Sequence, residues 1–409
     1  MVVNRKTRLK LVAFVLGLGF AVLFAEIAGR MMGLMPAHPS ASYIKLTQEV
    51  GRLPAPYSRT RFKEAGEFDI TLEFNAMGFR DPKTDFPDSF KGKKILAIGD
   101  SFATAWEVLH DQRWTEHMHR FRTDWSILNI GMRNWGIDQT YLNLVNYPLK
   151  HKPDIVLLMF FVGNDVSDNY RDAIIKTKWD APHFVPKNAR PMSFNDLQKM
   201  PWSGYKNPYD EPKRLSFPRN VNSWLRLHSV VYRTIDLLRQ FVQEKAGAAL
   251  EEDAHPNSSE PPATWGVFRV GEDSPEWQTA WNITEILLQE IKKVTQQRNT
   301  QLMVVIAPLS PLIEPEFAET AKKKGLLDPS KYDLTKPTRR LLDFGKANDI
   351  LMLDLTPGLM DFRKEQPAAG KLFFPKDGHF TPLGNCVVAS QIVNWIDPNN
   401  EVNSKSCLQ

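Results

Sequence analysis

The chain has 409 residues, of which 42% are hydrophobic and 24% are charged, and its formal net charge at pH 7 is +5. This composition is typical of a globular protein with a sizeable core, organised as one large domain with additions or as two domains. No basic stripe is interleaved with aromatic residues, which argues against nucleic acid as a partner. Only Cys386 and Cys407 are present, which excludes a disulfide framework and leaves the redox compartment open.

The amino terminus predicts a membrane anchor. Four basic residues lie between Arg5 and Lys10, and an uncharged run follows over residues 11–25. That run spans roughly 22 Å as a helix, short of a hydrocarbon core of about 30 Å, but a helix continued to Met35 is long enough. A cleaved signal peptide is the alternative, although no clean cleavage site follows. We expect residues 1–35 to form a cytoplasmic stub and a single-pass signal anchor in the cell membrane, with the remaining chain outside the cytoplasm.

Residues 36–90 are polar, contain prolines and show no clear periodicity. They are interpreted as a juxtamembrane linker followed by an irregular amino-terminal extension. The main domain is expected over residues 91–398, with a short tail over residues 399–409.

Within this domain, short continuous apolar runs are typical of buried parallel strands. The runs cover residues 94–99, 126–130, 154–162, 301–307 and 349–355. Helical patterns lie between several of them, and Ser274 followed by Pro275 predicts a helix start. The alternation indicates an α/β fold with a doubly wound parallel sheet.

One interval interrupts the alternation. Residues 166–273 contain no convincing core strand and are too long for a simple connection. Residues 222–249 carry apolar residues at helical spacing, whereas residues 251–262 have a disordered composition. We interpret the interval as a mostly helical insertion whose role the sequence leaves open.

Four segments of the chain carry polar residues where predicted strands end. Ser101 follows the first strand as Gly-Asp-Ser, and the loop over residues 129–139 follows the second. Asn164 closes the third strand, and Asp377-Gly378-His379 lies near the carboxyl end of the chain. Ligands of parallel sheets bind outside the carboxyl ends of the strands, so we expect these segments to meet there.

Their order and placement resemble the SGNH (GDSL-type) hydrolase superfamily over about residues 93–165 and 300–396. Members carry a serine, a loop glycine, an asparagine and a histidine in four blocks on a flavodoxin-like three-layer sandwich. The resemblance therefore implies this fold here, with the amino-terminal transmembrane helix and the insertion as additions. It also implies a serine enzyme without a metal or another cofactor.

The resemblance implies a role for each matching residue. Ser101 matches the nucleophile and its N–H an oxyanion donor, Asn164 matches the asparagine donor, His379 the general base and Asp377 its orienting carboxylate. The family glycine falls nearest Asn134, whose backbone N–H is expected to serve, since asparagine tolerates left-handed backbone conformations. Supporting positions around these groups are Asp100, Gly131, Gly136 and Asp165.

Two departures from the family pattern are visible. The segment after Ser101 lacks the glycines common there and has Ala105 and Glu107 instead. Asp377 precedes His379 by two positions rather than three, a spacing similar to that of membrane-anchored relatives acting on cell-surface polysaccharides.

These features favour a serine hydrolase that removes O-acyl groups, most simply O-acetyl, from a surface or exported glycan. A small acyl ester is the simpler form of the same substrate. Transfer of the acyl group to a sugar hydroxyl, as in O-acetylation of a polysaccharide, uses the same residues and is the close alternative. An anchored, non-catalytic glycan-binding or assembly protein is the alternative of another class. The sequence does not indicate the oligomeric state.

Overall fold

The computed structural model separates into two units, Met1–Tyr43 with Glu211–Ser258, and Ile44–Asp210 with Ser259–Gln409. Each unit is described by itself. The structure describes residues 5–31, 44–47, 51–54, 56–64, 66–170, 229–232, 234–235, 263–323 and 327–408. Most of the insertion predicted over residues 166–273 lies outside these ranges.

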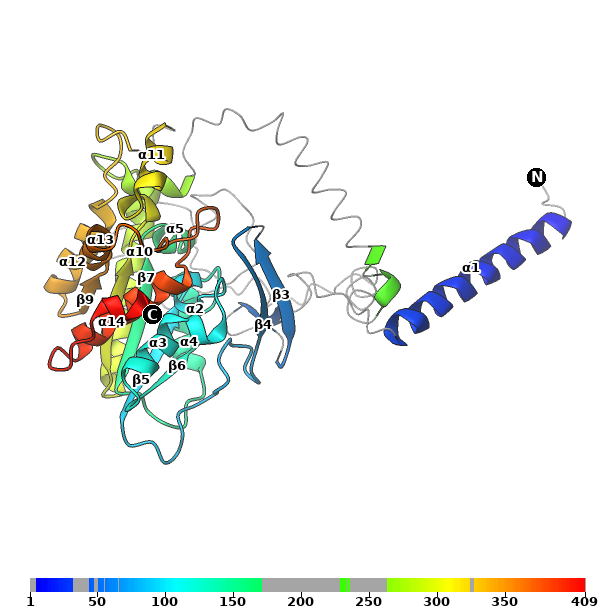
Figure 1. The fold of residues 1–409 in the computed structure, drawn as a ribbon, viewed down its shortest axis with the longest axis horizontal. Coiled ribbons are helices and arrows are strands. Elements are labelled where there is room, and N and C mark those ends of the chain that lie inside the picture. Colours follow the sequence, from blue (N-terminus) through cyan, green and yellow to red (C-terminus); the bar gives the residue numbers. More distant parts are fainter. Residues whose placement is uncertain are drawn as a thin grey trace. The chain divides into compact units, whose positions relative to one another are not determined.

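A five-stranded, all-parallel sheet forms the centre of the larger unit (Figure 1). Its strand order is β6-β5-β7-β8-β9. The strands are β5 (Lys93–Gly99), β6 (Trp125–Asn129), β7 (Ile155–Phe161), β8 (Gln301–Ala307) and β9 (Leu351–Asp354). The chain leaves β5 for β6 on one side and returns to β7 on the other, so the order reverses at β5. The predicted α/β fold with a parallel sheet is confirmed, and ligand sites are expected at this reversal.

Helices cover both faces of the sheet. On one face α3 (Trp114–Phe121) packs against α14 (Pro382–Ile396), which also contacts α13 (Thr356–Glu365). Elsewhere α4 (Ile137–Asn146) packs against α10 (Pro275–Gln297). Alternate strand residues point to opposite faces, so each helical layer meets its own row of buried apolar side chains. Among the described residues of this unit, the remaining helices are α2 (Ser101–Thr104), α5 (Asp165–Asp168), α11 (Pro315–Lys323), α12 (Lys336–Ala347) and short 3₁₀ turns at His110–Gln112, Ala263–Phe268, Ser310–Leu312 and Ser404–Leu408.

The predicted start of α10 is confirmed at Ser274 and Pro275. Proline suits the first helical position because its φ is already helical and its missing N–H would have no intrahelical acceptor there. The Ser274 hydroxyl donates to the Glu276 carboxylate, at 2.8 Å, instead of capping the helix backbone.

The extension over residues 36–90 is not irregular throughout, so that prediction was wrong. β3 (Arg59–Glu64) pairs with β4 (Phe68–Glu73) in an antiparallel hairpin, and β1 (Ile44–Thr47) pairs with β2 (Gly51–Pro54). In β4 buried and exposed residues alternate strictly, which is the period of a strand with one face on a core.

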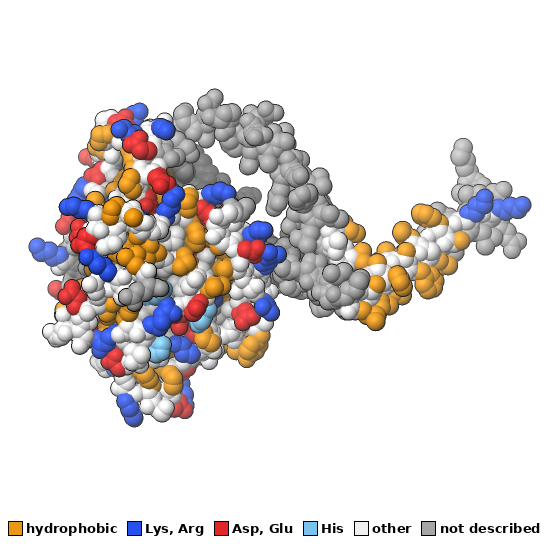
Figure 2. Space-filling model, in the orientation of Figure 1, with side chains coloured by type: hydrophobic (Ala, Val, Ile, Leu, Met, Phe, Trp, Pro, Cys, Tyr) orange, Lys and Arg blue, Asp and Glu red, His pale blue; other side chains and the backbone are white. Residues whose placement is uncertain are grey.

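The smaller unit contains α1 (Arg5–Met31), in which the large apolar side chains that the structure describes between Phe14 and Met31 are exposed (Figure 2). Across the part of the chain that the structure describes, no helix combines the length and the hydropathy needed to cross a membrane. The anchor remains a prediction from the sequence.

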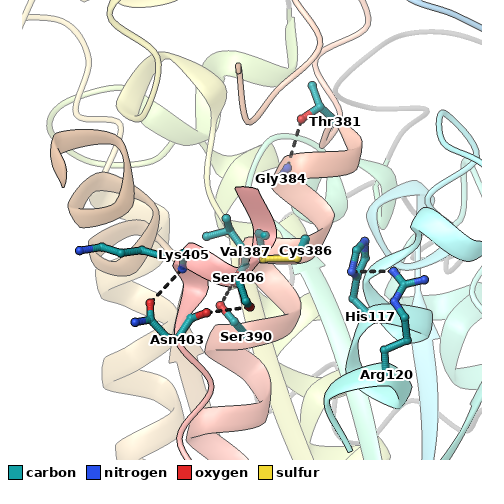
Figure 3. Close-up of a disulfide and its surroundings, with 11 residues drawn as sticks. His117, Arg120, Thr381, Gly384, Cys386, Val387, Ser390, Asn403, Lys405 and Ser406 are labelled. Atoms are coloured by element: carbon teal, nitrogen blue, oxygen red, sulfur yellow. Dashed lines mark hydrogen bonds between the residues drawn. A yellow bond between two sulfur atoms is a disulfide. The ribbon is translucent and has the colours of Figure 1, made fainter. Parts of the chain in front are cut away.

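The two cysteines form a disulfide between Cys386 on α14 and Cys407 in the last 3₁₀ turn (Figure 3). The sequence separation is 21 residues. Asn403 stabilises the same turn, because its side chain accepts from the Lys405 N–H and its carbonyl accepts from the Ser406 hydroxyl. The end of the chain is therefore fastened to a helix of the main core.

Candidate active site

Strand β5 delivers Ser101 to the carboxyl edge of the sheet. Gly99 adopts a φ of 135°, and a Cβ there would lie 2.4 Å from the carbonyl oxygen of Met159, so only glycine fits. Asp100 then caps α2, since its Oδ1 accepts from the Phe102 N–H at 2.8 Å. Ser101 is the first residue of this short helix and is 7% exposed.

A tight turn before α14 presents the histidine. Gly378 has a φ of 86°, a left-handed conformation that suits glycine. The Gly378 N–H donates to the Phe374 carbonyl, and the Phe374 N–H donates to the His379 carbonyl. These two bonds fix the backbone on either side of the turn and so orient the imidazole.

The structure brings Ser101, His379 and Asp377 together. Ser101 Oγ lies 2.7 Å from His379 Nε2, and His379 Nδ1 lies 2.5 Å from Asp377 Oδ1. With the Nδ1 proton donated to Asp377, Nε2 is left as the acceptor for the serine proton. This is the arrangement of a nucleophile, a base and an orienting carboxylate.

Buried charges govern the protonation of this group. Burial disfavours the charged imidazole, but the Glu107 and Asp377 carboxylates outweigh it, and the pKa of His379 is raised. Burial alone would raise the pKa of Asp377, but the hydrogen bond and the charge of His379 lower this pKa below its usual value. Asp377 is therefore ionised whenever His379 can act as a base.

The loop after β6 offers Asn134 as a backbone donor. Asn134 has a φ of 64°, the left-handed conformation in which asparagine replaces the glycine of the family pattern. The neighbouring Gly131 N–H is bound to Asn129 Oδ1 at 3.0 Å, and the Gly136 N–H is bound to Gln139 Oε1 at 2.7 Å. Within the described ranges no acceptor occupies the Asn134 N–H, so of these three groups it is the one free to bind an oxyanion.

Asn164 lies at the end of β7, next to β5 at the same edge of the sheet. One of its amide N–H groups donates to Asp168 Oδ2 at 2.8 Å. An amide has two such hydrogens, so one remains for a substrate oxygen. Within the described part of the chain, no hydrogen bond joins the Asn164 side chain to Ser101.

Asp100 and Asp165 act on the backbone. Besides capping α2, Asp100 lies 3.3 Å from Ser101 Oγ through Oδ2, and burial raises the pKa of Asp100. Asp165 accepts from the Phe161 N–H at 2.9 Å. Burial and then the nearby Asp100 raise the pKa of Asp165 well above its usual value. Asp100 therefore holds the start of α2 and Asp165 holds the end of β7 at the edge of the sheet where the serine lies.

Sequence reasoning missed Glu67, which lies at the turn between β3 and β4. Its carboxylate accepts from the N–H groups of Lys376 and Asp377, at 2.6 and 3.0 Å. Phe68 packs on Phe374 in the same contact, with ring centroids 5.3 Å apart. The hairpin of the extension therefore braces the turn that carries the histidine. The alternation in β4 was the available signal for the strand, but nothing in the sequence pairs Glu67 with that turn.

Glu107, Asp377 and His379 are the group of possible metal ligands in the described residues, with ligand atoms within 4.8 Å of one another. The 2.5 Å separation of His379 Nδ1 and Asp377 Oδ1 is that of a direct hydrogen bond. Two ligand atoms at about 2.0–2.2 Å from one cation lie farther apart than this. The arrangement fits a shared proton better than a metal ion.

Comparison with known proteins agrees with this geometry. Residues 268–406, which include Asp377 and His379, match a family described as the SGNH hydrolase-like domain, acetyltransferase AlgX. The carboxyl-terminal part of the chain is therefore similar to an SGNH hydrolase-like domain. No curated protein matches the chain.

Several solved structures are similar to the chain. A lipolytic protein of the G-D-S-L family from Veillonella parvula is 9% identical, with 75% of this chain and 98% of that chain covered and a TM-score of 0.34. The acetyl xylan esterase AlAXEase is 14% identical, with coverages of 74% and 99% and a TM-score of 0.36. The acetylxylan esterase Axe2 from Geobacillus stearothermophilus is 11% identical, with coverages of 76% and 98% and a TM-score of 0.36.

The site has the groups that acyl transfer through a serine requires. His379 can take the Ser101 proton as Oγ attacks an acyl carbon, and Asp377 stabilises the imidazolium that forms. The N–H groups of Ser101 and Asn134 and the Asn164 amide are the candidate donors to the oxyanion. Donors that are fixed before the reaction stabilise the developing charge without reorganisation.

Proposed function

We propose that this chain is a serine esterase that removes O-acetyl groups from a surface or exported glycan. The observation that carries the proposal is the contact of 2.7 Å between Ser101 Oγ and His379 Nε2, with Asp377 on the other ring nitrogen. A serine hydroxyl is a weak nucleophile until a positioned base takes its proton, and this arrangement supplies the base. A non-catalytic binding protein has no need of it.

Acetyl transfer to a sugar hydroxyl is the second candidate. The matched family is described as an acetyltransferase, and this description favours transfer. The acetyl-serine intermediate is common to both reactions. Water resolves it in an esterase, and a bound sugar hydroxyl resolves it in a transferase.

The two reactions are separated by their products. The full chain, purified in detergent, is expected to release p-nitrophenol from p-nitrophenyl acetate. It is then incubated with the same donor and with unacetylated oligosaccharides, and acetate and acetylated sugar are quantified by mass spectrometry. Acetate alone, in amounts unchanged by the sugar, supports the esterase. Acetylated sugar formed at the expense of acetate supports the transferase, and neither product contradicts both.

The extracytoplasmic location and the membrane anchor are part of this proposal. The basic residues between Arg5 and Lys10 favour a cytoplasmic amino terminus by the positive-inside rule. The disulfide between Cys386 and Cys407 adds support, since disulfides persist in oxidising compartments and are rare in the cytosol.

A reporter fused after Gln409 tests this location. Alkaline phosphatase is expected to be active there, and β-galactosidase at the same position inactive, because the carboxyl terminus lies outside the cytoplasm. The reverse pattern would exclude both the orientation and a surface glycan as substrate. Sequencing the amino terminus of the purified protein separates an anchor from a cleaved signal, since a mature protein beginning between Ala28 and Arg30 would show cleavage.

A further inference from the structure

Glu107 is a buried carboxylate beside the proposed base. It follows α2 and is 1% exposed, and neither carboxylate oxygen has a hydrogen-bond partner within the described ranges. Its Oε1 lies 3.6 Å from His379 Nδ1 and 3.9 Å from Arg133 Nη1. Burying a carboxylate without partners is costly, so a glutamate at this position calls for a reason beyond packing.

The charges around His379 provide one. Asp377 and Glu107 lie on the Nδ1 side of the ring, and Asp100 lies beside Ser101 on the other side. Two cations act on these groups. The charge of Arg133 acts on both Glu107 and Asp377, and its guanidinium lies 4.7 Å from the centroid of the Phe62 ring. The buried Arg80, which donates to the carbonyls of Ala105 and Val108 on either side of Glu107, also acts on Glu107. The three carboxylates of Asp377, Glu107 and Asp100, together with these two guanidinium groups, are one positive charge short. Protonation of His379 supplies that charge.

We propose that Glu107 is a positioning residue that acts through His379: with Asp377, its carboxylate balances the imidazolium formed when Ser101 attacks the acyl carbon. This inference rests on the proposed acyl-transfer function. In the step, the bond from Ser101 Oγ to the acyl carbon forms, the Oγ proton moves to His379 Nε2, and the carbonyl π electrons move to the oxygen. The charge of Glu107 is compensated best in the state with the imidazolium, so it favours that state over the resting one.

Replacing Glu107 with glutamine tests the charge at nearly constant shape. Burial and the charge of Asp377 raise the pKa of Glu107, whereas the charges of His379 and Arg133 oppose that rise. Because an ionised Glu107 raises the pKa of His379, removing it is expected to lower that pKa by about 1. The acid limb of kcat/KM then moves to lower pH, since the neutral imidazole is the base. We expect kcat to fall about 10-fold with little change in KM.

Stability distinguishes this role from a purely structural one. A buried carboxylate without hydrogen bonds costs folding free energy. When Glu107 is replaced, His379 keeps its hydrogen bond to Asp377, so no buried charge is left without a partner at the imidazole. Glu107→Met and Glu107→Gln are therefore expected to keep or raise Tm while lowering kcat. If Glu107 only supported the fold, both variants would have a lower Tm than the wild type.

A double-variant cycle measures the overlap between the two carboxylates. Loss of the orienting aspartate alone costs about 10⁴-fold in a well-studied serine protease. Here Asp377→Asn is expected to cost less, because Glu107 still balances the imidazolium. Adding Glu107→Gln to Asp377→Asn is expected to reduce kcat by more than the product of the two single effects.

The pKa of His379 is measured in the full chain by NMR titration with labelled histidine, and the signal is assigned by its loss in His379→Gln. Nine histidines make this practicable. The matched control is Glu285→Gln on α10, a glutamate paired with Arg340 at 2.8 Å, which is expected to leave that pKa unchanged. A pKa that falls in both Glu107 variants supports the inference. A pKa unchanged in both overturns it, whatever happens to Tm.

The titration does not depend on turnover, so the experiments can contradict the proposed function and the role of Glu107 independently of each other. A wild-type chain without esterase or transferase activity would contradict the proposed function. A fall in the pKa of His379 in the Glu107 variants would still show that the carboxylate acts on the imidazole.

Discussion

Replacing Ser101 with alanine is expected to reduce kcat by about 10⁶-fold, the size of effect seen when a serine nucleophile is removed from a hydrolase. The change removes one hydroxyl from a largely buried position and creates no large cavity, so the fold should persist. His379→Ala is expected to cost nearly as much, and the double variant little more, because nucleophile and base act as a unit. Release of p-nitrophenol from p-nitrophenyl acetate measures all three.

The matched control is Ser390→Ala on α14. Ser390 is as well buried as Ser101, but its hydroxyl donates to the Val387 carbonyl of its own helix. The Ser390→Ala variant should therefore retain wild-type activity. Complementation of a deletion strain, scored by the acyl content of its surface polysaccharide, extends the test to cells. If Ser101→Ala and His379→Ala both restored the wild-type phenotype, the catalytic proposal would fail and a scaffold role would take its place.

The sheet was predictable because buried parallel strands are short apolar runs. All five predicted runs became β5 to β9, with bounds that differ by up to two residues at an end. The meeting of Ser101 and His379 was predictable for a related reason. The carboxyl ends of parallel strands share one edge, and the resemblance to a known family placed the histidine there.

The hairpin of β3 and β4 was missed although its signal was present. Phe68, Ile70 and Leu72 are buried and alternate with exposed residues, which is the period of a strand. The average composition of residues 36–90, which is polar and contains prolines, does not show this local alternation. Residues 59–64 and 68–73 are separated by only a short turn, so the alternation and the turn together predict a β-hairpin.

The contacts of Glu67 and Glu107 were not predictable from one sequence. Glu67 binds backbone groups about 310 positions away, and Glu107 faces a histidine from a distant segment. Such contacts depend on the packing of several elements at once, and no local pattern encodes them. Glu107 was noticed only as a residue that stands where relatives have glycine.

Replacing Asn164 with alanine is expected to lower kcat by about 10²–10³-fold, because one donor to the oxyanion is lost. KM should change little, since that hydrogen bond strengthens only as negative charge develops on the substrate oxygen. Asn164→Asp is the sharper variant. It keeps the shape of the side chain but replaces the amide with a carboxylate that repels the oxyanion, so its loss should exceed that of Asn164→Ala.

The bond from Asn164 to Asp168 offers a rival explanation, in which the asparagine only holds the start of α5. Asp168→Asn separates the two, since it removes the charge that accepts this bond and leaves the proposed oxyanion donor in place. If Asn164 acts on the substrate, Asp168→Asn should retain most of the activity that Asn164→Ala loses. Equal losses in kcat for the two variants, with equal falls in Tm, would instead assign Asn164 to the stability of that turn and leave the oxyanion to the backbone donors at Ser101 and Asn134.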